Sequence, residues 1–105
     1  MSAKGISLLG NQSAKGFLKA LFGVKSAHDP ASITSPNDND TTLTVTGARL
    51  GDFVIVAPVT SIPAGGAIVG WVSATDTVTI RFIGIVGTVD STSQDFNVLV
   101  LGNRD

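Results

Sequence analysis

The segment WVSATDTVTIRF, residues 71–82, carries the clearest structural signal in this chain. In its second half, the apolar residues Val78, Ile80 and Phe82 alternate with threonine and arginine, which is the period-two pattern of a strand with one buried face. The pair Thr75-Asp76 separates this run from the preceding one with turn-forming residues. Two strands joined by a tight turn make a β-hairpin, so the segment predicts antiparallel β-structure.

Runs of β-branched and apolar residues recur on both sides of this hairpin, where Gly, Pro and Asp separate them at intervals of roughly ten residues. The predicted strands are residues 42–46, 53–57, 67–74, 77–86 and 96–101. The chain has no internal repeat and no alternation of strands with helical patterns, so a parallel α/β fold is disfavoured. The sequence predicts a mainly β fold class, a small antiparallel β-sandwich or barrel of the jelly-roll-like kind.

Several predicted strands have more apolar surface than one small domain can bury. Residues 53–56 and 98–101 are apolar on both faces, because they read FVIV and VLVL. About 60 residues of β-structure cannot cover both faces of such strands, so we expect other copies to do so in a homo-oligomer. The predicted oligomer interface consists of aromatic and aliphatic residues on these strands and on the hairpin: Phe53, Ile55, Trp71, Ile83, Ile85, Leu99 and Leu101.

Length and composition fit a single domain that works with other chains. With 105 residues, the chain is long enough for one domain and too short for two. It is 43% apolar and only 14% charged, so we expect partners to cover part of its apolar surface. The absence of cysteine excludes a disulfide framework, a thiolate zinc site and a cysteine nucleophile.

The N-terminal part of the chain is basic and the remainder is acidic. Residues 1–28 contain four lysines and no acidic residue, whereas the rest of the chain contains three arginines and all eight aspartates. Ser13 can cap a short amphipathic helix in this basic part. The helix would carry an apolar face and a lysine face, formed by Phe17, Leu18, Leu21 and Phe22 and by Lys15 and Lys19.

Residues 29–41 are rich in Pro, Asn, Asp and Ser, a composition typical of a linker. The predicted organisation is therefore an N-terminal attachment arm at 1–28, a linker at 29–41 and a β-sandwich oligomerisation domain at 42–105. Because a polar linker separates arm and domain, we expect the two to fold independently.

Neither a membrane nor nucleic acid is expected as the main partner. The longest apolar runs are far shorter than the ~20 residues of a membrane span, and residues 6–9 are too few for the core of a secretory signal. A net charge of −1 does not favour binding to nucleic acid. The four lysines of the arm leave a membrane-active or nucleic-acid-associated arm as an alternative.

The sequence offers little for catalysis. His28 is the single histidine, and no spacing assigns it a serine and an aspartate, so we interpret it as a solvated loop residue. The aspartates mark turns and not an acid–base pair. An enzyme is the least favoured function class, and no cofactor, metal or small-molecule substrate is expected.

Two further features allow a binding interpretation beside a structural one. The segment 37–40, Asn-Asp-Asn-Asp, contains oxygen ligands that suit Ca²⁺, but it lacks the glycine and the distal glutamate of an EF-hand loop, and a solvated linker is favoured. Trp71 could stack on a sugar or a base. Its apolar neighbours Val69 and Val72 favour burial in the core or between subunits instead.

Three segments together resemble small structural proteins of tailed-bacteriophage virions: LGDFVIVAP at 50–58, GWVSA at 70–74 and TVTIRF at 77–82. The resemblance covers about residues 41–101. It implies a small β domain of a capsid decoration, head-fibre or tail component that assembles with itself, often as a trimer.

This resemblance implies a capsid decoration, or cement, protein that trimerises and binds the outside of the capsid shell to stabilise it. The protein would be made in the host cytoplasm and would reside on the capsid surface, with the major capsid protein as its partner. The capsid-binding residues would then be those of the arm: Lys15, Phe17, Leu18, Lys19, Leu21 and Phe22. The alternative is a tail or head-fibre adhesin whose loops, such as residues 62–66, recognise a host surface.

Overall fold

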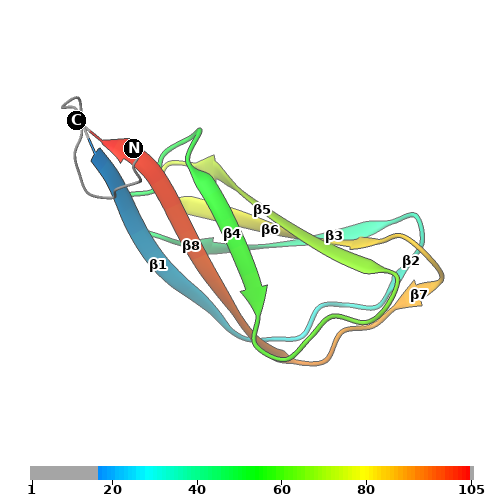
Figure 1. Cartoon of the computed structure of the whole chain (residues 1–105). Helices are drawn as coiled ribbons and strands as arrows, with labels where there is room; N and C mark the ends of the chain where they lie inside the picture. Colours follow the sequence, from blue (N-terminus) through cyan, green and yellow to red (C-terminus); the bar gives the residue numbers. More distant parts are fainter. Residues whose placement is uncertain (1–16, 105) are drawn as a thin grey trace, which may run out of the picture.

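The computed structural model describes residues 17–104, which form eight strands and no helix. In chain order these are β1 (Phe17–His28), β2 (Ile33–Thr34), β3 (Asp38–Thr44), β4 (Phe53–Pro58), β5 (Gly66–Ala74), β6 (Thr77–Gly84), β7 (Thr88–Val89) and β8 (Gln94–Arg104). Six of them form two three-stranded antiparallel sheets, β1-β8-β4 and β3-β6-β5, and β2 pairs with β7 at one end (Figure 1). Within the described residues, no helix is long and apolar enough to cross a membrane.

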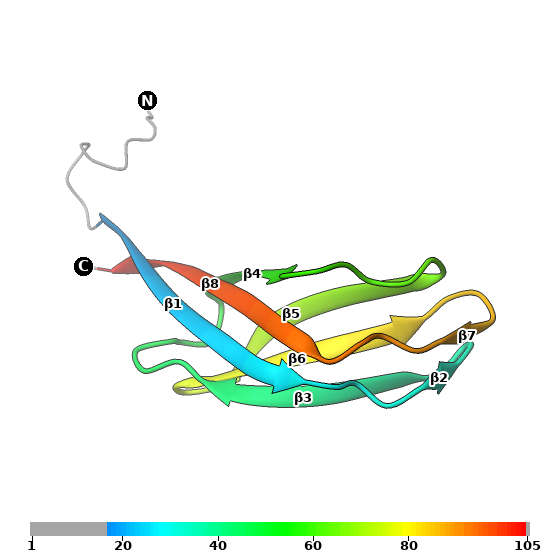
Figure 2. The same cartoon turned by 90° about the horizontal axis from the view of Figure 1, so that it is seen from below.

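The two three-stranded sheets form the two layers of a sandwich (Figure 2). Their central strands, β8 and β6, supply most of the core, because every second side chain on each points between the layers. The rings of Phe82 and Phe96 meet edge to face across this space, with 5.2 Å between their centroids. The buried apolar side chains of the two strands are Val78, Ile80, Phe82, Phe96, Val98 and Val100. The predicted antiparallel β-sandwich is confirmed.

The predicted hairpin is present as β5 and β6. Ala74 pairs with Thr77, and Asp76 takes a positive φ of 63°, a conformation that aspartate tolerates in tight turns. The Asp76 carboxylate accepts a hydrogen bond from the Gly47 backbone N–H at 2.8 Å, which ties the turn to the loop after β3. The strands predicted at 53–57, 67–74, 77–86 and 96–101 are found as β4, β5, β6 and β8, with shifted ends.

Along one side of the sandwich, β4 lies against β5 and requires a residue without a side chain. A Cβ atom on Gly70 would come within 2.7 Å of Val56 Cγ2 and 2.9 Å of Val54 Cγ1. Because real Cβ atoms do not approach carbon so closely, glycine at this position allows the two sheets to meet.

The predicted helix is wrong within the described residues. Residues 17–28 form β1, which pairs with β8 from Phe17 opposite Arg104 to His28 opposite Gln94. The predicted helix has only about ten residues and is marginal in water, whereas β8 supplies a long apolar partner strand. Ser13 and Lys15 lie outside the described residues. The expectation that arm and β domain are separate is therefore incorrect for residues 17–28, which belong to the sheet.

The predicted linker also contains more structure than its composition suggests. It includes β2 and the first residues of β3, which begins at Asp38 and not at Thr42. Polar side chains are compatible with an edge strand, because one face of β3 is in water.

Candidate functional site

The outer side of the β1-β8-β4 sheet is covered by apolar side chains. The register aligns Phe22 with Leu99 and Ile55 in one row, and Ala20 with Leu101 and Phe53 in the next. We call this surface the apolar face, and its members are Leu18, Ala20, Phe22 and Val24 of β1, Leu99 and Leu101 of β8, and Phe53, Ile55 and Ala57 of β4. Asn97 and Asn103 lie on the same side of β8, in the two end rows of the face, where they pair with Val24 and Leu18.

The apolar face is strongly exposed. Phe22 is 79% exposed, Phe53 72%, Ile55 55%, Val24 51% and Leu18 48%. None of the described residues that make up this face is charged. A contiguous apolar patch of this kind is typical of an interaction surface.

The outer side of the other sheet, β3-β6-β5, is mostly polar. Arg81 donates two hydrogen bonds to the Asp40 carboxylate, at 2.8 and 3.0 Å, and its guanidinium carbon lies 4.9 Å from the centre of the Trp71 ring. The hydrogen bond from Arg81 lowers the pKa of Asp40, and the same bond raises the pKa of Arg81. The hydroxyls of Thr79 and Ser73 are hydrogen-bonded at 2.7 Å. The sandwich therefore has two unlike outer sides.

Trp71 lies on this polar side and is 37% exposed. Of the two alternatives predicted for Trp71, burial in the core is wrong, and burial between subunits stays a prediction. Its position follows from the β5–β6 register, because Trp71 pairs with Thr79. Thr79 stands between the core residues Val78 and Ile80 in the sequence, so its side chain lies on the opposite, outer side of the sheet. The cation–π contact with Arg81 accounts for an aromatic residue on this side.

The structure divides the predicted oligomer interface between two surfaces. Phe53, Ile55, Leu99 and Leu101 come together on the apolar face. The other three do not join them: Trp71 and Ile83 belong to the β3-β6-β5 sheet, and Ile85 follows β6.

The predicted capsid-binding residues are divided as well. Leu18 and Phe22 lie on the apolar face, whereas Leu21 points inward and packs against the core. Lys19 lies on the inward side and lines an open groove with Arg49 at the end of the sandwich. Phe17 begins β1, and Lys15 lies outside the described residues.

Three members of the apolar face are not among the predicted site residues: Ala20, Val24 and Ala57. A signal for the first two is present, since residues 18, 20, 22 and 24 are all apolar and alternate with Lys19, Leu21, Gly23 and Lys25. This is a period-two pattern.

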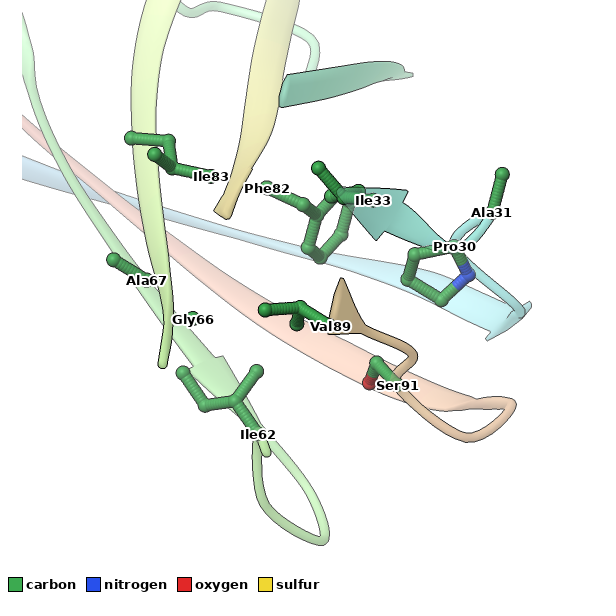
Figure 3. A pocket seen from close by; sticks show the side chains of 10 residues that line it. All are labelled: Pro30, Ala31, Ile33, Ile62, Gly66, Ala67, Phe82, Ile83, Val89 and Ser91. Carbon is green, nitrogen blue, oxygen red and sulfur yellow. The ribbon is translucent and has the colours of Figure 1, made fainter. Parts of the chain in front are cut away.

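The cavity shown in Figure 3 lies at the end of the sandwich near β2 and β7. Its walls are mostly apolar, with Ile33, Phe82 and Val89 prominent and Ser91 contributing a hydroxyl. Its volume of about 10 Å³ is only enough for a single water molecule. It therefore offers no room for a substrate or a cofactor.

His28 is not the solvated loop residue that was predicted. It ends β1 and stacks on Phe82, with 5.5 Å between ring centroids. Burial lowers the pKa of His28 below its ordinary value of 6.5, the charge of Lys25 lowers it further, and the carboxylate of Asp29 opposes this.

The segment 37–40 does not gather its oxygens around one point. Asp40 is held by Arg81, while the Asn39 amide donates to the Ala31 carbonyl at 3.2 Å. Successive side chains of a strand point to opposite sides, which separates them further. Among residues 17–104, no group of three or more His, Cys, Asp or Glu side chains is placed to hold a metal ion.

Comparison with known proteins identifies no relative of the chain: no family model matches it, and no curated protein or solved structure is significantly similar to it.

Proposed function

We propose that this protein is a structural subunit of a virion, a capsid decoration protein that trimerises and binds the outside of the shell. It acts by binding and not by catalysis. The observation that carries the proposal is the apolar face, an exposed and uncharged surface over the whole β1-β8-β4 sheet. The resemblance of residues 41–101 to small phage virion proteins is the reason for proposing a virion as the assembly.

Attachment to the capsid then uses basic residues near the N-terminus and in the groove beside it. Residues 1–16 contain Lys4 and Lys15, and β1 begins next to the groove that Lys19 and Arg49 line. No ion pair involves Lys19 or Arg49 among the described residues. An acidic surface of the major capsid protein would suit these charges. Three such contacts on one trimer bind more tightly together than each does alone, because the second and third are intramolecular.

One observation favours the adhesin alternative. Trp71 is partly exposed beside Arg81 and Asp40, and an aromatic ring next to hydrogen-bonding groups is a surface that can bind a sugar. In that function the apolar face still joins the copies, and the polar sheet is the part that meets the host.

Binding to particles tests the proposal. Purified protein is mixed with capsids that lack it, sedimented, and located on the particles by electron microscopy with a labelled chain. We expect copies distributed over the shell and a particle that resists heat better than the undecorated one. Copies confined to the tail would support the adhesin, and no association with any particle would contradict both.

A further inference from the structure

We infer that other copies of this chain cover the apolar face, so that the β1-β8-β4 sheets of three subunits face one another around the trimer axis and the subunits do not add strands at the sheet edges. The inference rests on the proposed function as an assembling subunit. It also moves Leu18 and Phe22 from capsid binding, where their sequence pattern placed them, to contacts between copies.

The size of the apolar face agrees with a subunit interface. Its five most exposed side chains leave roughly 500 Å² of apolar surface in water, near the upper end of the largest patch on a typical monomer. A standard interface buries about 800 Å² on each partner. Ala20, Ala57, Leu99 and Leu101 extend the same surface toward that area.

The lack of charge on the apolar face indicates which kind of partner covers it. Because its described members carry no charge, two copies of the face do not repel each other, and a charged partner would lose hydration there without gaining an ion pair. The two polar side chains in the end rows of the face, Asn97 and Asn103, are uncharged as well. Other copies of this chain, which present the same uncharged face around the trimer axis, are therefore the best match.

The edges of the β1-β8-β4 sheet are poorly suited to strand addition. On the edge strand β1, Lys19 and Lys25 point to the inner side, and the pairing with β8 is irregular between Lys25 and His28. The Lys25 ammonium donates to the Thr42 carbonyl of β3 at 2.9 Å, which places a charge beside this edge. On the other edge strand, β4 ends at Pro58. Lysines, irregularities and proline at edges are the features that prevent edge-to-edge pairing.

Two valines make a matched test, because both are exposed, both lie on edge strands, and they are on opposite sides of the sandwich. Val24 of β1 is 51% exposed on the apolar face, and Val69 of β5 is 45% exposed on the polar side. The experiment measures the mass in solution of the full chain and of Val24→Asp and Val69→Asp by light scattering after gel filtration over a range of concentrations. Ile55→Asp is a second variant on the apolar face, and circular dichroism confirms that each variant is folded.

We expect the full chain to form an oligomer of the 10.7 kDa subunit. Val24→Asp and Ile55→Asp should raise the dissociation constant by about tenfold or more, because each buries an unpaired charge between subunits, whereas Val69→Asp should leave it unchanged. Oligomers that survive both apolar-face changes, or that are equally weakened by Val69→Asp, would overturn the inference while leaving the proposed function intact.

Two other outcomes separate the remaining explanations. A monomeric full chain that oligomerises after deletion of residues 1–16 would show that this segment covers the face, and would overturn the inference. An oligomer that the apolar-face variants dissociate, but that binds no particle, would support the inference and contradict the proposed virion function.

Discussion

At the scale of single residues, Gly70 shows how little space separates the two sheets. We predict that Gly70→Ala lowers the free energy of unfolding by about 1–3 kcal/mol, because the new methyl group would overlap Val56 and Val54. Urea denaturation measures this change. The double variant Gly70→Ala/Val56→Ala should cost less than the sum of the two single changes, since the smaller side chain makes room. Strict additivity would show that the contact is not what disfavours alanine.

His28 predicts a pH dependence of stability. Its pKa is lowered in the folded protein, mainly by burial, so the unfolded chain takes up a proton more readily. The free energy of unfolding should therefore fall as the pH drops below the ordinary value of 6.5, and the loss should be complete below the folded pKa. Denaturation at neutral pH and at mildly acidic pH tests this, with His28→Gln as the control that removes the effect. Equal or greater stability of the native chain on the acidic side would contradict it.

Trp71 shows where a residue-by-residue interpretation of the sequence fails. Its neighbours Val69 and Val72 suggested burial, but Val69 and Trp71 lie on the outer side while Val72 points into the core. Only the pairing of β5 with β6 determines which side chains of β5 point outward and which point into the core. A bulge between Val72 and Ala74 shifts that pairing near the turn. The contact with Arg81, which makes the exposed position favourable, involves a different strand.

At the scale of elements, β1 shows why a segment predicted as a helix forms a strand. Its residues carry two periodic patterns at once: 17, 18, 21 and 22 fit a helix face, and 18, 20, 22 and 24 fit a strand face. What selects the strand is β8, which lies more than 60 residues away in the chain and pairs with β1 along its length. A sequence window contains no information about such a distant partner. The strands of the hairpin were predicted correctly because their partner is local.

We predict that deletion of residues 1–28 severely destabilises the protein, because it exposes one edge of β8 and removes Leu21 from contact with the core. Thermal denaturation followed by circular dichroism should show the melting temperature lowered by more than about 10 °C, or no cooperative transition. Deletion of residues 1–16 is the control, because it removes no described strand. A melting temperature equal to that of the full chain after the longer deletion would mean that β1 contributes little to the fold.

At the scale of the whole molecule, the sandwich has two outer sides of opposite character. The side built by β3, β6 and β5 satisfies its own charges through Arg81 and Asp40, and the side built by β1, β8 and β4 has apolar side chains with nothing over them among residues 17–104. This contrast accounts for part of the low charge content of the chain, because the members of the apolar face carry no charge.

The surplus of apolar surface could be predicted from sequence, because FVIV and VLVL are apolar in both alternations. Its location could not. Which strands share a sheet depends on topology, so residues of two sheets, such as Ile55 and Trp71, were grouped in one interface. Phe22, the most exposed large side chain of the apolar face, was assigned to a separate arm for the same reason.

The central claim, that copies of the chain cover the apolar face, can be measured through the reactivity of single thiols. The natural chain has no cysteine, so Ala20→Cys on the apolar face and Thr42→Cys on the polar side each introduce one thiol at an exposed position of an edge strand. Alkylation by a maleimide is followed in the native protein at several concentrations. We predict that the thiol at position 20 reacts slowly and more slowly still as the protein concentration rises, while the thiol at position 42 reacts fast at every concentration. Equal rates at the two positions, independent of concentration, would contradict the claim.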